Sequence, residues 1–154
     1  MDFLTLCIVF GANYLIALPV MVFGAYLWFK PAEARMRLIA TAALALPIAY
    51  LLVRLAGLLY AHPQPFAVYE FDPVVPHDID NSFPSDHVAI AGVFATVVFL
   101  HHRLLGLGLW VATALIALAR MSAGLHWSSD VFAAAAIAAL AVFASQNSIR
   151  TLKL

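Results

Sequence analysis

The sequence predicts an all-α integral membrane protein, folded as one domain over residues 1–154 and built as a bundle of about five transmembrane helices. Of the 154 residues, 65% are hydrophobic and only 10% are charged, and the mean hydropathy is +0.98. Soluble domains are nearer half apolar and a quarter charged, so a soluble chain of this length could not bury so much apolar surface. No linker rich in proline, glycine and serine divides the sequence, which favours a single domain.

Five apolar runs account for the predicted helices, and they cover residues 3–29, 38–60, about 86–100, 104–119 and about 130–144. The first two runs exceed the ~20 residues that cross ~30 Å of hydrocarbon. The last three are shorter, so their helices must extend into polar flanks or lie where the bilayer is thinner. Pro19 and Pro47 fall inside the long runs, where neighbouring helices can satisfy the carbonyl groups that a proline leaves free. The first run lacks a basic leader, so we expect it to remain as a membrane helix.

The charged residues are divided between the two ends of the predicted helices. Five spans place the termini on opposite sides, and six of the eight basic residues then share the C-terminal side: Lys30, Arg35, Arg37, Arg103, Arg150 and Lys153. Seven of the eight acidic residues share the other side: Asp2, Glu70, Asp72, Asp78, Asp80, Asp86 and Asp130. The positive-inside rule makes the basic side cytoplasmic. We therefore expect the N-terminus outside and the C-terminus in the cytoplasm.

Three polar segments converge on the predicted outer face. They are "YAHPQPF" at residues 60–66, "FPSDH" at 83–87 and "ARMSAGLHWSSD" at 119–130. An ionisable side chain within or beside the membrane is costly, so it marks a functional site by default. Three such segments at one depth predict a shared site.

The third segment carries groups suited to phosphate chemistry. His126 and Asp130 are four residues apart, so they share one face if the helix begins early, and the carboxylate can then hold one ring nitrogen. The other nitrogen is left free to attack or to accept a proton. The planar guanidinium of Arg120 matches the geometry of phosphate oxygens.

The second segment predicts the start of a helix. Pro84 and Ser85 are typical of that position, and the free N–H groups of a helix N-terminus bind anions. His87 would lie in the first turn, where it could donate a proton to a leaving oxygen. The two segments together predict a site for a phosphate group at the outer leaflet.

These motifs resemble the signatures of the type 2 phosphatidic acid phosphatase superfamily. Arg120-x5-His126-x3-Asp130 resembles its third signature, "FPSDH" resembles the second, P-S-G-H, and "HPQPF" lies where the first, K-x6-R-P, would end. The aspartate in "FPSDH" and the preceding "NSF" are similar to bacterial undecaprenyl-diphosphate phosphatases of the bacitracin-resistance type. The resemblance covers roughly residues 60–131.

The resemblance implies a role for each matched residue. His126 would be the nucleophile that forms a phosphohistidine, and Asp130 would orient it. His87 would protonate the leaving group and later help to activate water. Arg120 and Ser85 would hold the phosphate. No metal or cofactor is implied, because fixed positive charge stabilises the transferring phosphoryl group.

The first signature lacks both of its cations. Gln64 stands in place of the arginine and Gly57 in place of the lysine. Arg54, about one turn before Gly57, and His62 are the two candidates to replace them. Gln64 itself remains a candidate phosphate contact. His77 is most simply a loop residue.

Other residues near the signatures have competing interpretations. Ala119 replaces the serine before Arg120, which removes a hydroxyl donor. Asp86 replaces a glycine, and its charge would repel phosphate unless it points away or is neutralised. It also suits a first-turn acid that stabilises the helix dipole. Ser85 suits a plain N-cap, and Arg54 suits a polar contact that reaches toward water.

The implied function is hydrolysis of undecaprenyl diphosphate, or a related lipid phosphate, at the outer face of a bacterial inner membrane. The implied partners are the lipid substrate and membrane lipids, without nucleic acid. A homodimer is compatible with so thin a bundle, although no motif specifies one. Two alternatives stay open: a non-catalytic protein that binds or moves a phospholipid or carrier lipid, and a structural subunit of a membrane complex.

Overall fold

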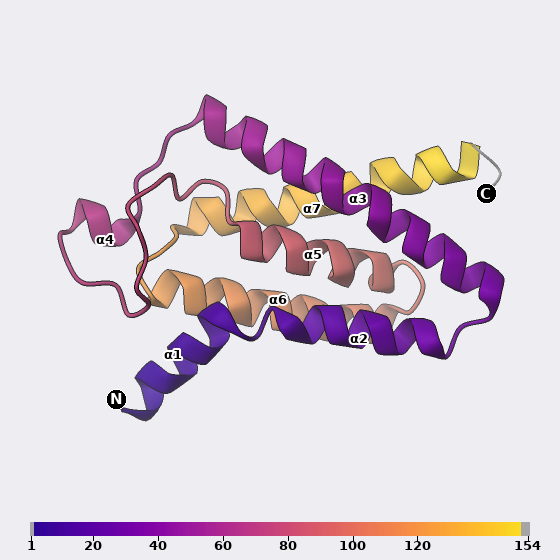
Figure 1. The fold of residues 1–154 in the computed structure, drawn as a ribbon, viewed down its shortest axis with the longest axis horizontal. Coiled ribbons are helices and arrows are strands. Elements are labelled where there is room, and N and C mark those ends of the chain that lie inside the picture. The colour runs from indigo at the N-terminus through magenta and orange to yellow at the C-terminus, as the bar shows by residue number, and fades with distance from the viewer. Residues whose placement is uncertain (1, 152–154) are drawn as a thin grey trace.

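The computed structural model describes residues 2–151, with side chains described as far as Ile149. Across these residues the regular structure is helical, apart from an isolated bridge between Pro63 and Asn81. Figure 1 shows the helices α1 (Phe3–Asn13), α2 (Ala17–Trp28), α3 (Ala32–Leu59), α4 (Pro65–Val68), α5 (Asp86–Phe99), α6 (Arg103–Ser122) and α7 (Ser128–Thr151). The all-α class is confirmed for this part of the chain. Two of the basic residues expected on the cytoplasmic side fall at the end of the described part. The side chain of Arg150 and the whole of Lys153 lie outside it.

The central helix of the bundle is α5. It contacts α2, α3, α6 and α7, and ten of its 14 residues are buried. Glycines let its neighbours approach closely. A Cβ atom at Gly92 would lie 2.9 Å from Cβ of Ala138, and one at Gly106 would lie 2.2 Å from Cα of Phe99. Small residues permit such close packing between membrane helices, and α5 lies among α2, α3, α6 and α7 (Figure 1).

The first predicted helix, residues 3–29, is interrupted. The chain bends by 53° at the short break between α1 and α2. Pro19 lies in the first turn of α2, where its ring would clash with the carbonyl of Leu15 in a continuous α-helix. The break relieves this clash with a tighter turn, in which the N–H of Leu18 donates to the Leu15 carbonyl at 3.0 Å. Pro47, by contrast, lies inside the unbroken α3.

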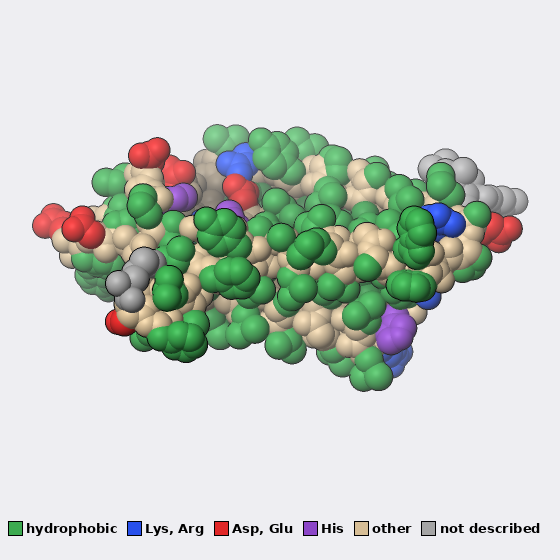
Figure 2. Space-filling view, turned by 60° about the horizontal axis from the view of Figure 1, so that its bottom comes forward, with side chains coloured by type: hydrophobic (Ala, Val, Ile, Leu, Met, Phe, Trp, Pro, Cys, Tyr) green, Lys and Arg blue, Asp and Glu red, His purple; other side chains and the backbone are tan. Residues whose placement is uncertain are grey.

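The helices have the length and surface of membrane spans. Three of them, α3, α6 and the stretch Ser128–Ile149 of α7, are long and apolar enough to cross a membrane, and the bent pair α1–α2 makes a fourth if it counts as one span. Large apolar side chains cover their outer surface (Figure 2), such as Phe3 at 82% exposure and Trp28 at 79%. An apolar surface of this extent indicates a multi-pass membrane protein. The expected count of five spans and their orientation are not confirmed.

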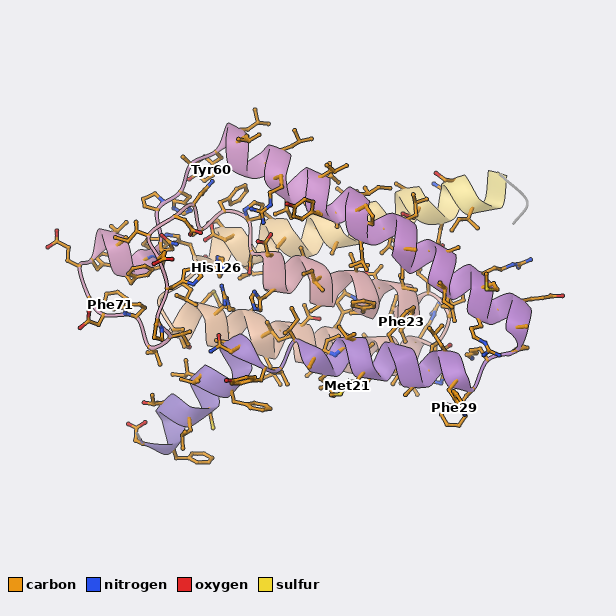
Figure 3. The ribbon with its side chains drawn as sticks, in the orientation of Figure 1. Met21, Phe23, Phe29, Tyr60, Phe71 and His126 are labelled. Carbon is orange, nitrogen blue, oxygen red and sulfur yellow. The ribbon has the colours of Figure 1, made fainter. Side chains whose placement is uncertain are left out.

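One end of the bundle gathers the three polar segments. The loop around α4 lies over this end, beside the start of α5 and the turn between α6 and α7 (Figure 1). Figure 3 shows Tyr60 and His126 at this end, whereas Phe29 marks the other end. The N–H of Ser82 donates to the carbonyl of His62 at 2.8 Å, which joins the loop after α3 to the loop before α5. Segments far apart in the sequence therefore meet here.

Candidate active site

A sharp turn after α6 brings His126 back beside Arg120. Gly124 adopts a φ of +80°, a left-handed conformation that glycine allows at the end of a helix. The N–H of Leu125 then donates to the carbonyl of Arg120 at 3.1 Å, which closes the turn. A Cβ atom at Gly124 would lie 2.7 Å from the ring of Phe71, so the loop above leaves room only for glycine.

The hydrogen bonds of His126 define which ring nitrogen is reactive. The guanidinium of Arg120 lies 3.1 Å from Nε2, and because arginine only donates, Nε2 accepts and carries the lone pair. Nδ1 carries the hydrogen and donates to the carbonyl of Ser82 at 2.8 Å. The imidazole and the guanidinium are both buried. Nε2 is therefore the nitrogen of this ring that carries the lone pair.

Asp130 is held by several donors at the start of α7. Its Oδ2 accepts from the N–H of Trp127 at 2.8 Å, the arrangement of an acid in the first turn that caps its own helix. Its Oδ1 accepts from Nδ1 of His62 at 3.0 Å and from the hydroxyl of Ser129 at 3.1 Å. The side chain is completely buried. The carboxylate therefore has a fixed orientation.

The contact between His126 and Asp130 is looser than the four-residue spacing predicts. Nδ1 of His126 lies 3.7 Å from Oδ2 of Asp130, beyond hydrogen-bond distance. The reason is that α7 begins at Ser128, so the histidine precedes the helix and does not share a helical face with the aspartate. The carbonyl of Ser82 takes the direct hydrogen bond, and the carboxylate lies behind it as a nearby negative charge.

The start of α5 presents a free hydroxyl and a histidine. Ser85 is the N-cap of this helix, but its side chain makes no capping hydrogen bond. Among the described residues, Oγ of Ser85 and Nε of Arg120 are two of the three buried side-chain polar atoms without a partner. Buried polar atoms are nearly always paired, so both are available to an incoming anion. First-turn N–H groups add further donors.

A cavity of about 480 Å³ at the same end of the bundle is lined by Arg120, His126 and His87, whereas Ser85 and Asp130 are not among the residues of its wall. Its wall carries seven ionisable side chains: Arg54, His77, Asp80, Asp86, His87, Arg120 and His126. Figure 2 shows basic, acidic and histidine side chains gathered beside a recess at this end. The structure therefore brings the two histidines and the arginine of the second and third signatures to one cavity.

Comparison with known proteins identifies the family. The model of the PAP2 superfamily matches residues 36–153. The chain belongs to the PAP2 superfamily. This confirms the family that the three motifs resemble. Among solved structures, LpxE of Aquifex aeolicus superposes with a TM-score of 0.69 at 26% identity, covering 94% of this chain and 84% of that one.

Three curated proteins are similar in sequence to this PAP2 chain. The bacitracin transport permease protein BcrC of Bacillus licheniformis is 31% identical over 82% of this chain and 61% of its own length. The putative undecaprenyl-diphosphatase YbjG of Escherichia coli K12 is 34% identical over 68% and 54%. The undecaprenyl-diphosphatase BcrC of Bacillus subtilis 168 is 30% identical over 58% and 46%. The chain thus spans about half the length of these relatives.

The two positions that hold cations in the first PAP2 signature carry uncharged residues here, and they place no positive charge on the cavity wall. Gln64 is buried at 1% exposure. Its amide NH₂ donates to the carboxylate of Asp80 and, at 3.2 Å, to the carbonyl of Asp78, and its oxygen accepts from the N–H of Asp80 at 3.1 Å. The structure places Gln64 as a support for the loop above the site and not on the cavity wall.

The loop before α5 covers the position of the signature lysine. A Cβ atom at Gly57 would lie 3.0 Å from the carbonyl oxygen of Phe83, so a lysine there would require the loop to move. His62, one candidate to replace the missing cations, also lies away from the cavity wall, with its ring nitrogen on Asp130. Of the two candidates, only Arg54 lines the cavity.

Arg54 and Asp86 form an ion pair on the cavity wall, and each side chain is about 50% exposed. The guanidinium also lies over the ring of Tyr50, 5.1 Å from its centroid. A partner on α3 thus neutralises the charge of Asp86. Neutralisation is one of the two conditions under which this carboxylate would not repel a bound phosphate. Because Arg54 is paired with Asp86, its guanidinium is not free to bind phosphate in this structure.

Sequence reasoning did not assign three contributors to the site. The carbonyl of Ser82 binds Nδ1 of His126, but a backbone oxygen leaves no mark in a side-chain pattern. His77 and Asp80 line the cavity, although their segment has the composition of an ordinary loop. Within the described residues, no group of three or more His, Cys, Asp or Glu side chains is placed to hold a metal ion. Independence from metal remains a prediction.

The ion pair predicts opposite effects of its two members on anion binding. Asp86→Asn is expected to tighten binding of orthovanadate, a phosphate analogue, about three- to tenfold, because Arg54 then keeps its charge without a partner. Arg54→Met is expected to weaken binding by a similar factor, since it leaves Asp86 unpaired. Isothermal titration of purified protein in detergent measures both.

The double variant, Arg54→Met with Asp86→Asn, is the control for this test. It removes both charges, so its affinity should return close to that of the wild type. Weaker binding by Asp86→Asn alone would show that the carboxylate does not act through Arg54.

Proposed function

We propose that this chain is a lipid phosphatase that hydrolyses undecaprenyl diphosphate, or a related lipid phosphate, and releases inorganic phosphate through a phosphohistidine on His126. The observation that carries the proposal is the shared cavity, where Nε2 of His126 carries a lone pair beside Arg120 and His87 lines the same wall. The names of two relatives, YbjG and the Bacillus subtilis BcrC, support the choice of lipid.

Phosphate binding is the first step. The guanidinium of Arg120 transfers from Nε2 of His126 to the phosphate oxygens, because a bidentate pair with an anion is stronger than a bond to a neutral ring. The unpartnered Oγ of Ser85 and Nε of Arg120 donate to the same oxygens. The N-terminus of α5 adds positive potential. Binding therefore frees the lone pair of Nε2 as it brings the phosphorus atom near.

Two displacements then complete the reaction. Nε2 of His126 forms a bond to phosphorus, and the bond from phosphorus to the leaving oxygen breaks while His87 donates a proton to that oxygen. Water then attacks the phosphohistidine, His87 takes its proton, and the nitrogen–phosphorus bond breaks to release inorganic phosphate. The carbonyl of Ser82 and the carboxylate of Asp130 stabilise the positive charge on the ring.

We further propose that the chain crosses a bacterial inner membrane five times, with its N-terminus and this cavity outside. Supporting this, acidic side chains dominate the end with the cavity, and basic side chains gather at the opposite end (Figure 2). Lys30 lies between α2 and α3, and Arg35 and Arg37 lie in the first two turns of α3. This end of the bundle is far from the loop around α4 (Figure 1). The positive-inside rule then orients the bundle.

A non-catalytic lipid-binding protein is the second candidate. One observation favours it: Gly57 and Gln64 put no positive charge on the cavity wall, and Arg54 is paired with Asp86. Such a protein would bind a lipid phosphate without releasing phosphate from it. The assay described next separates the two functions.

Replacing His126 with alanine is expected to reduce phosphate release on the order of 1000-fold or more, because the nucleophile is lost. The measurement is colorimetric phosphate release by purified protein in detergent, with EDTA present. The substrates are undecaprenyl diphosphate, phosphatidic acid and phosphatidylglycerol phosphate. His101→Ala, at the opposite end of the bundle, is the matched control. Undiminished release by His126→Ala would remove this residue from the mechanism, and no release by the wild type would favour the lipid-binding protein.

Orientation can be tested with a single introduced cysteine. Ile79 lies in the loop above the cavity and is 74% exposed, and the sole natural cysteine, Cys7, can be replaced by serine. Ile79→Cys in that background should react with a membrane-impermeant maleimide added to cells whose outer membrane is permeabilised. Ala34→Cys, in the first turn of α3, should react only after the cells are lysed. The reverse pattern would place the cavity in the cytoplasm.

A further inference from the structure

The ring of His62 is held between Asp130 and Trp127. Its Nδ1 donates to Oδ1 of Asp130 at 3.0 Å, and its face stacks on the indole of Trp127, with 5.4 Å between ring centroids and a tilt of 22°. The indole N–H of Trp127 in turn donates to the carbonyl of Pro63 at 2.8 Å. Stacking and hydrogen bonding therefore fix the imidazole in one orientation, with Nδ1 toward the carboxylate.

The backbone of the same residue holds the loop that contacts His126. The carbonyl of His62 accepts from both the N–H and the hydroxyl of Ser82, each at 2.8 Å. The N–H of His62 donates to the side-chain oxygen of Asn81 at 2.9 Å. These bonds fix Ser82, whose own carbonyl accepts from Nδ1 of His126 at 2.8 Å.

Both oxygens beside Nδ1 of His126 therefore depend on His62. One is the Ser82 carbonyl, held through the His62 backbone, and the other is Oδ2 of Asp130 at 3.7 Å, held through the His62 ring. The His62 ring does not line the cavity, so it is not placed to bind phosphate. Its position suits a residue that acts on the nucleophile from behind.

We propose that His62 is a positioning residue for the reaction: through Asp130, its ring orients the negative charge that stabilises the His126 ring when that ring becomes positive. The proposal rests on the function proposed above, in which His126 is the nucleophile. Hydrogen bonds that orient a reacting group from outside are worth about 10- to 100-fold in activity where they have been measured at metal sites. We expect a loss in that range.

Three substitutions separate the hydrogen bond from the stacking. His62→Phe keeps a ring on Trp127 but cannot donate to Asp130. His62→Asn keeps an N–H donor near the position of Nδ1, and His62→Gln places its donor near the position of Nε2 instead. His62→Phe and His62→Gln should lower kcat for phosphate release from undecaprenyl diphosphate about 10- to 100-fold, with KM within about threefold.

His62→Asn should restore most of the lost kcat. His101→Phe, at the other end of the bundle, controls for the introduced ring. If His62→Phe does not fold, the comparison of His62→Gln with His62→Asn makes the same test. Equal kcat for the wild type and His62→Phe, or for His62→Gln and His62→Asn, would overturn the proposal while leaving the proposed function intact.

A double-mutant cycle tests whether the ring acts through Asp130. In an Asp130→Ala background, His62→Phe should cause little further loss, because the group that it orients is already absent. The same fold-loss with and without Asp130 would show that His62 acts by another route, and would overturn the proposal.

A spectroscopic readout separates this proposal from the proposed function. In protein labelled with ¹⁵N-histidine, the signal of the His126 Nδ1–H should shift in His62→Phe and return toward the wild-type position in His62→Asn. An unchanged signal in His62→Phe would overturn the proposal even in an active enzyme. A shifted and restored signal would support it even if the wild type released no phosphate, in which case only the proposed function fails.

Discussion

The hydrogen bond from Nδ1 of His126 to the carbonyl of Ser82 is the contact on which the candidate site depends. At 2.8 Å, it fixes the tautomer and the plane of a ring that no helix holds, because the residue lies between α6 and α7. It therefore decides that Nε2 carries the lone pair and lies against Arg120. The turn at Gly124 and the loop before α5 serve this contact by bringing the two segments together.

Much of this arrangement could be predicted from the sequence. Composition and the five apolar runs predicted a helical membrane chain, and many large apolar side chains are indeed exposed on the described helices. The spacing of Arg120, His126 and His87 within recognisable signatures predicted a shared phosphate site, and these three side chains line one cavity. Their side chains are chemically distinctive and stand at fixed spacing, so the pattern can be recognised from the sequence alone.

The remainder depends on contacts that no local pattern records. A proline in an apolar run can interrupt the helix or leave it continuous. The helix breaks before Pro19 but continues through Pro47, and the runs alone do not tell these two outcomes apart. The partner of Asp86 is Arg54, 32 residues away, and their pairing follows from how α3 packs against α5. Gln64 matched a signature position, yet it faces the loop, because Asp80 satisfies its amide.

The structure of the protein with bound orthovanadate tests the central claim most directly. We expect vanadium to be bonded to Nε2 of His126, with Arg120 and Ser85 on its oxygens and Nδ1 still donating to Ser82. Vanadate bonded to another side chain, or a His126 ring turned so that Nδ1 faces the cavity, would contradict the account.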